Sequence, residues 1–141
     1  MSMLLGVFTV RKSVSAVMLA VSMMVSARAD VSVPTYNVVF RMGAGGWSFM
    51  VDRNSIDKSG DTRRFVQVID LGEHAGNEVR SRRSLEEADC KDGKTRTLEE
   101  TVFDGPVATG KVLREAKEIS EWSTEAEGSP GKAILTFVCG Q

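Results

Sequence analysis

Alternation of apolar and polar residues with a period of two is the feature that most constrains this fold. Between residues 36 and 42 every second residue is apolar, and the same pattern returns at 47–51 after a glycine-rich stretch at 43–46. Successive side chains of a strand point to opposite faces of a sheet. The pattern therefore predicts two consecutive antiparallel strands joined by a glycine turn.

The rest of the chain is mostly strand by the same criterion. Residues 52–61 are polar apart from one isoleucine, and we expect them to form a connection rather than a strand. Further strands are predicted at 65–71, 78–90, 95–103 and 107–118, with a loop at 72–77. The β-branched content of these runs favours strands over helices. A charged helix over 111–118 is an alternative for the last of them.

One helix is expected near the end of the chain. Ser129 followed by Pro130 is typical of a helix start, with an N-cap and a proline in the first turn. Ile134, Phe137 and Val138 then follow at the i, i+3 and i+4 spacing of one helix face. A strand over 133–139 is the alternative, because this segment is also rich in β-branched residues.

Residues 1–29 differ in composition from the rest of the chain. They contain no acidic residue, three basic ones and five of the seven methionines. A basic pair, an apolar run and a closing A-x-A are the layout of a secretory signal peptide, so we predict cleavage after Ala29 and a single domain at 30–141. An uncleaved membrane anchor and a buried core helix are the alternatives. The apolar run at 13–26 is about 14 residues long, shorter than the roughly 20 needed to cross a bilayer.

Export would place the two cysteines, Cys90 and Cys139, in an oxidising compartment. An even number of cysteines in a small exported domain predicts a disulfide, and two cysteines allow only one pairing. The bond would close a loop of 50 residues and stabilise the fold by about 4 kcal/mol in the chain-entropy model. A pair of free, reactive thiols is the competing interpretation.

Charge and composition exclude several classes of function. The chain has 18 basic and 19 acidic residues, and after cleavage at Ala29 there would be 15 and 19, a net charge of −4. A dedicated nucleic-acid binder carries excess positive charge, so nucleic acid is not an expected partner. Two cysteines and one histidine cannot supply a four-ligand Cys/His zinc site or an iron–sulfur cluster. We expect no metal and no cofactor.

The residues also argue against catalysis. The single histidine, His74, lies in a polar loop where a general base would be poorly positioned. Glu86 and Glu87, like Glu99 and Glu100, are neighbours on predicted strands and point to opposite faces, so neither pair can act on one substrate. We expect these carboxylates to be solvated, assign no catalytic residue, and predict that the protein is not an enzyme.

Three arginines close together form the one conspicuous charged feature. In the segment Arg80-Ser81-Arg82-Arg83, the first and third residues would project from the same face of a strand. Guanidinium groups bind sulfate, phosphate and carboxylate through paired hydrogen bonds, so Arg80, Arg82 and Arg83 are the candidate binding residues. The alternative is that they form ion pairs across the sheet. The partners would then be Glu86, Glu87, Glu99 and Glu100.

Short motifs are spread over residues 37–139: Met50-Val51-Asp52, Ser55-Ile56, Ser84, Asp89-Cys90, Arg96, Gly110-Lys111-Val112, Trp122, Ser129 and Cys139. Together they resemble the surface-adhesin protein E family of small exported bacterial proteins. The resemblance implies an α+β fold that is mainly β, with a twisted antiparallel sheet of about six strands. It also implies one C-terminal helix, tied to the sheet by the pair Cys90 and Cys139.

The resemblance implies a domain that binds a protein partner, such as a host extracellular-matrix or serum protein. Two alternatives stay open: a periplasmic accessory protein whose partner is an envelope protein, and an inhibitor of a basic extracellular enzyme such as lysozyme. No cysteine lies at the predicted cleavage site, so we expect a periplasmic or secreted protein with no lipoprotein anchor and no membrane span after cleavage. The oligomeric state is left open.

Overall fold

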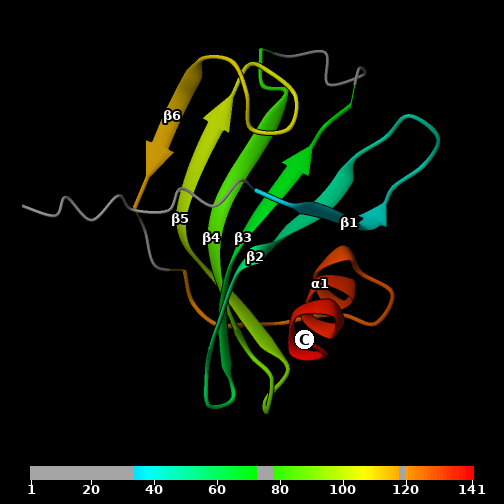
Figure 1. The fold of residues 1–141 in the computed structure, drawn as a ribbon. Coiled ribbons are helices and arrows are strands. Elements are labelled where there is room, and N and C mark those ends of the chain that lie inside the picture. Colours follow the sequence, from blue (N-terminus) through cyan, green and yellow to red (C-terminus); the bar gives the residue numbers. More distant parts are fainter. Residues whose placement is uncertain (1–33, 73–77, 118–119) are drawn as a thin grey trace, which may run out of the picture. The chain divides into compact units, whose positions relative to one another are not determined.

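The computed structural model describes residues 34–72, 78–117 and 120–141, which belong to the unit Val31–Gln141. The elements are β1 (Tyr36–Arg41), β2 (Ser48–Ser59), β3 (Thr62–Asp70), β4 (Ser81–Asp89), β5 (Lys94–Phe103), β6 (Val112–Ala116), β7 (Ser123–Thr124) and α1 (Pro130–Cys139). The first six strands form one antiparallel sheet in the order of the sequence, and β7 adds a short pairing to β5 (Figure 1). The predicted signal peptide at 1–29 and residues 73–77, with His74, lie outside the described residues.

The strand β2 is longer than the sequence predicts. The expected connection at 52–61 is wrong, because β2 continues to Ser59 and turns at Gly60 directly into β3. A β-bulge between Asp52 and Asp57 separates the apolar half of β2 from this polar half. The Ser55 hydroxyl fills the bulge, donating to the Asp52 carbonyl (2.7 Å) and accepting from the Val66 N–H (2.8 Å). The polar half of the hairpin is largely exposed, so no apolar alternation marks it.

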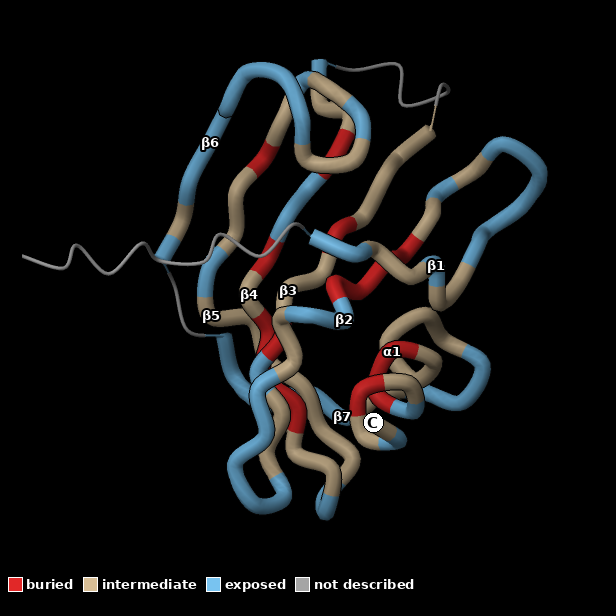
Figure 2. Tube along the Cα trace, viewed as in Figure 1, coloured by how far each residue is buried: buried red, intermediate tan, exposed pale blue. Residues whose placement is uncertain are grey.

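The helix α1 begins where the sequence predicts. Ser129 is the N-cap, its Oγ accepts from the backbone N–H of Lys132 (3.1 Å), and Pro130 occupies the first turn. Ile134, Leu135 and Val138 are buried, which places one face of the helix against the sheet (Figure 2). The predicted helix is confirmed, and the alternative strand over 133–139 is wrong.

The core lies between α1 and one face of the sheet, which we call the helix face; the opposite face is the outer face. α1 packs mainly on β1 and β2, and the residues that meet there are apolar. Its buried members are Phe49, Val51, Phe65, Ala88, Ile134, Leu135 and Val138. Burial of such side chains contributes about 1.5–3 kcal/mol each. The helix supplies three of these seven buried residues, so its packing is a large part of what closes the core.

A disulfide joins Cys90, directly after β4, to Cys139, the last residue of α1, with a Cα–Cα distance of 5.6 Å. The predicted pairing is confirmed, and with it the predicted fold class: an antiparallel sheet with one C-terminal helix tied to it. Within the described ranges, no helix is long and apolar enough to cross a membrane.

The loop between β5 and β6 is tied to the ends of β3 and β4. The Asp70 carboxylate accepts from the N–H of Val107 (2.9 Å), and the buried Ser81 hydroxyl accepts from the N–H of Ala108 (2.9 Å). Residues 107–111 therefore form a loop, and the strand predicted at 107–118 is limited to β6. The alternative helix over 111–118 is wrong where the structure describes that segment.

Candidate binding surface

The three predicted binding arginines do not share one surface. Arg82 lies on the helix face, where its guanidinium is 3.6 Å from the Glu100 carboxylate. Arg83 is the next residue of β4, so its side chain points to the outer face. Arg80 precedes β4 and lines a separate hollow with Lys111. The contact of Arg82 with Glu100 fits the alternative of cross-strand ion pairs, and binding of anionic groups by the arginines stays a prediction.

The predicted solvation of the glutamates in β4 is wrong. Glu86 and Glu87 are only 9% and 7% exposed. They do point to opposite faces, as neighbours on a strand must: Glu86 lines a cavity of about 250 Å³ between the helix face and α1, and Glu87 lies on the outer face. A buried carboxylate must be neutralised or hydrogen-bonded, so each of these two needs its own local explanation.

Glu86 is held by hydroxyl groups rather than by a cation. The Thr97 hydroxyl lies 3.0 and 3.1 Å from the two carboxylate oxygens. Burial raises the pKa of Glu86 to about 7, the hydroxyls of Ser84 and Thr97 oppose this rise, and the nearby carboxylates of Glu100 and Glu125 add to it. Protonation of Glu86 therefore couples the charge of this cavity to pH near neutrality.

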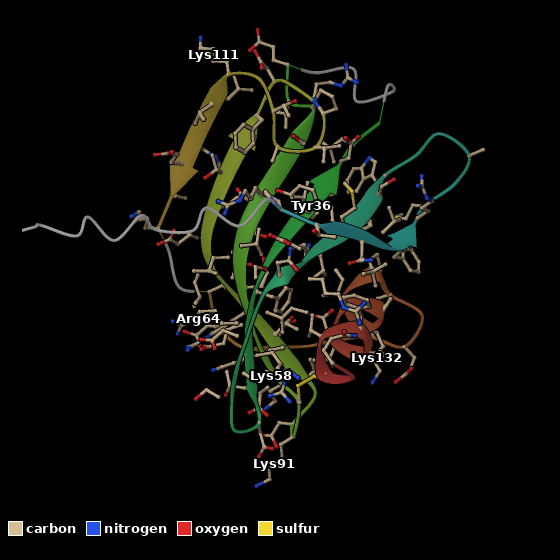
Figure 3. The ribbon with its side chains drawn as sticks, viewed as in Figure 1. Tyr36, Lys58, Arg64, Lys91, Lys111 and Lys132 are labelled. Carbon is tan, nitrogen blue, oxygen red and sulfur yellow. A yellow bond between two sulfur atoms is a disulfide. The ribbon has the colours of Figure 1, made fainter. Side chains whose placement is uncertain are left out.

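Glu87 is held instead by two arginines. Its carboxylate accepts from Arg96 Nε (2.7 Å) and from Arg64 Nη2 (3.2 Å), and Arg96 lies over the ring of Trp122, 4.4 Å from its centroid. Burial raises the pKa of Glu87, but the hydrogen bonds and charges of the two arginines outweigh it and hold that pKa below its usual value. Figure 3 shows Arg64 on the sheet, on the other side from α1. These contacts give Glu87, Arg64 and Arg96 a structural role. Trp122, whose ring contacts Arg96, remains partly exposed.

The candidate binding surface is a groove of about 520 Å³ between the edge of the sheet and the helix, which we call the edge groove. One wall is β1, and the other is a stripe of α1 with the segment before it (Figure 3, where Tyr36 and Lys132 are labelled). The lining residues are Val38, Val39, Phe40, Gly128, Ser129, Lys132, Ala133, Thr136 and Phe137. The lining is mainly apolar, and Lys132 is its one ionisable side chain.

Among the residues that the structure describes, the strand β1 has a partner strand on one side only. It is the first strand of the sheet and pairs there with β2. The Arg53 N–H donates to the Thr35 carbonyl (3.1 Å), which makes these two residues a hydrogen-bonded pair of the antiparallel ladder. Because such pairs alternate along the ladder, the N–H and C=O groups of Tyr36 and Val38 point away from β2. The free edge thus presents backbone donors and acceptors beside the edge groove.

Exposed apolar side chains extend this surface along the β1–β2 hairpin. Val38, Met42 and Trp47 are each between 45% and 47% exposed. Aromatic residues and methionine are enriched in protein–protein interfaces. The sequence predicts the strand at 36–42 and the helix after Ser129, but not that the two lie side by side. The groove between them therefore could not be predicted.

Among the described residues no three or more His, Cys, Asp or Glu side chains form a group that could hold a metal ion. The arrangement has the chemistry of a binding surface: an apolar groove, an unpaired strand edge and one flanking ammonium group.

Comparisons with known proteins identify the fold. No curated protein sequence matches the chain. Among solved structures, Haemophilus influenzae protein E in crystal form II aligns with a TM-score of 0.55 at 11% identity, covering 75% of this chain and 96% of that one. The selenomethionine form of the same protein aligns with a TM-score of 0.54 at 13% identity, covering 77% and 93%. At these identities the likeness establishes a shared fold. The sequence model of surface-adhesin protein E matches residues 39–140, most of the chain, and the protein therefore belongs to the surface-adhesin protein E family.

Proposed function

We propose that this protein is an exported, non-enzymatic binding domain that attaches to a host extracellular-matrix or serum protein. Membership of an adhesin family supports the general function. The observation that carries the proposal is the edge groove, because an apolar groove beside an unpaired strand edge is a recurrent way for a domain to hold a segment of another protein.

The proposal includes export. Residues 1–29 would be the signal peptide, residues 30–141 the mature domain, and the mature chain would be released to the periplasm or beyond without a lipoprotein anchor. The basic, apolar and A-x-A segments of the sequence support this, and the disulfide between Cys90 and Cys139 fits an oxidising compartment.

Export is tested by fractionating native cells and taking the intact mass of the protein with and without reductant. We expect a mass that begins at Asp30, lighter by two hydrogens before reduction. An uncleaved, reduced chain would overturn the export part of the proposal.

Binding is tested with the mature chain and three surfaces: immobilised basement-membrane extract, immobilised serum proteins, and casein as the blank. We expect saturable binding to at least one of the first two and none to the blank. The same chain with Thr136→Asp, which puts a charge into the edge groove at an exposed position of α1, should bind less while retaining its melting temperature within a few degrees. Binding to neither surface would reject the adhesive function.

The same material separates the two other functions. Inhibition of lysozyme by the mature chain would identify an enzyme inhibitor, and co-purification with one envelope protein in place of matrix or serum binding would identify an accessory protein. Either result would contradict the proposal made here.

A further inference from the structure

We propose that the edge groove binds an extended, acidic segment of a partner protein, which adds to β1 as a further strand of the sheet. This inference rests on the proposed binding function and deepens it, because it names the conformation and charge of what is bound. Three features of the described residues carry it: the free backbone groups, the shape of the groove, and its charge.

The first feature is the free edge. Tyr36 and Val38 direct their N–H and C=O groups away from β2, as the ladder shows. An extended segment laid along β1 would pair with these groups without breaking any bond of the native sheet. The edge is short, because a β-bulge shifts the register between Val38 and Phe40. A short, bulged edge suits a few residues of an extended segment better than a long strand of a second copy.

The second feature is the helix wall. Ser129, Lys132, Ala133, Thr136 and Phe137 follow the i, i+3, i+4, i+7 and i+8 spacing, so they form one continuous stripe of α1 beside β1. A groove between an edge strand and a helix is the arrangement by which PDZ domains bind extended peptides. Main-chain pairing with the strand supplies affinity there, and every second side chain of the peptide faces the helix. In this protein the small Ala133 leaves room for such a side chain, and the apolar Phe137 would pack against it.

The third feature is charge. Lys132 is the one ionisable residue of the lining, and Arg41, at the end of β1, is exposed and bonded only to the Ser48 hydroxyl (3.3 Å) among the described residues. The carboxylate opposite Lys132 is that of Glu127 (2.9 Å), whose side chain is 84% exposed. Exposed ion pairs of this kind are weak, so a carboxylate of the bound segment can replace Glu127.

The positive charge at the edge groove differs from the net charge of the domain as a whole. The domain at 30–141 would carry 15 basic and 19 acidic residues, yet the groove is flanked by cations. Charge complementarity therefore favours a segment that alternates apolar and acidic residues.

The test uses the mature chain and a fluorescein-labelled peptide of eight residues that alternates valine and glutamate. One control peptide replaces each glutamate with lysine, and a second replaces the two central residues with proline. Fluorescence anisotropy measures the affinity at two salt concentrations. Amide chemical shifts of the ¹⁵N-labelled chain locate the binding site.

Two pairs of variants address the mechanism. Val38→Pro removes an outward N–H without removing a bond to β2, and Val38→Thr keeps that N–H as its matched control. Lys132→Gln removes the groove's charge, and Lys58→Gln is its control on the exposed half of β2. We expect a loss of about tenfold for Val38→Pro relative to Val38→Thr and roughly threefold to tenfold for Lys132→Gln, with little change for Lys58→Gln.

The supporting result is binding of the glutamate peptide that weakens with salt, falls in these two variants, and shifts the amides of Tyr36 and Val38. Equal binding of the lysine peptide, equal binding by Val38→Pro, or no binding would overturn the inference. So would a dimer of the mature chain that Val38→Pro converts to a monomer, because the occupant would then be a second copy.

The outcomes also separate this inference from the proposed function. If Val38→Pro binds matrix or serum proteins as well as the original chain does, protein binding stands and strand addition is refuted. If the peptide binds as expected and neither surface does, the groove is a peptide site and the adhesive function fails.

Discussion

Replacing Glu86 with glutamine should change the pH dependence of stability more than any other single substitution in the sheet. The Glu86 carboxyl is buried in the cavity beneath α1, contacts the Thr97 hydroxyl, and faces the carboxylates of Glu100 and Glu125. Arg82 also lines this cavity, but its ion pair is with Glu100. Glutamine keeps the size of the side chain and an oxygen for the Thr97 hydroxyl, and it removes the charge.

The magnitude follows from the pKa. Burial raises the pKa of Glu86 from 4.5 to about 7 in the folded protein, and each tenfold change in proton affinity corresponds to about 1.4 kcal/mol. Between these two values the folded chain holds a proton that the unfolded chain has lost. The stabilisation that Glu86 contributes is therefore fully present below pH 4.5 and is lost as the pH rises through about 7. The total loss is about 3 kcal/mol by pH 8.

Urea unfolding of the mature chain at pH 5 and at pH 8 tests this value. Glu86→Gln should match the original chain at pH 5 within about 1 kcal/mol and exceed its free energy of unfolding by up to about 3 kcal/mol at pH 8. Glu99→Gln is the matched control, since Glu99 lies half exposed on β5, and its effect should stay within about 0.5 kcal/mol. If Glu86→Gln shifts stability equally at both pH values, the buried-carboxylate argument is refuted.

Three other substitutions test the remaining contacts. Cys139→Ser should cost about 4 kcal/mol and lower the melting temperature as far as reductant lowers that of the original chain; a melting curve unaltered by either treatment would show that the bond does not stabilise the fold. Arg96→Met leaves Glu87 buried with one arginine and should cost about 2–3 kcal/mol at pH 7, less once the pH is low enough to protonate Glu87, and a pH-independent cost in urea unfolding would contradict this. Gly72→Ala places a Cβ 2.6 Å from a backbone carbonyl oxygen of the β1–β2 turn at a φ of +68°, so it should melt below Gly60→Ala, which has φ +58° and open space around it.

Most of the fold could be predicted from the sequence because most of its elements bury one face. The run at 47–51 alternates because Phe49 and Val51 face the core, and Ser129 with Pro130 marks the helix start. The prediction failed for residues 52–61, where Ile56 is the one apolar residue packed against the core and the other side chains are polar, so no apolar alternation marks the strand. An alternating apolar pattern therefore indicates that one face of a strand is buried. A strand that buries little apolar surface does not show the pattern.

The site could be predicted far less well. The burial of Glu86 and Glu87 depends on Thr97 and Arg96, which lie on the next strand, and single-sequence patterns do not show which residues are opposite one another. The edge groove depends on where α1 packs relative to β1, a contact between segments about ninety residues apart. The arginines at 80–83 were conspicuous in the sequence because they are adjacent, yet their side chains separate onto different surfaces.

The position of α1 after all the strands in the sequence has a consequence for how the protein is made. Every strand pairing from β1 to β6 joins neighbours in sequence, so the sheet can assemble hairpin by hairpin as the chain emerges. Its helix face, with Phe49, Val51 and Phe65, stays uncovered until residues 130–139 arrive. Cys90 must likewise wait for Cys139, which follows it by 49 residues. During synthesis and export the nascent sheet is thus an open, aggregation-prone apolar surface until α1 covers it and closes the domain.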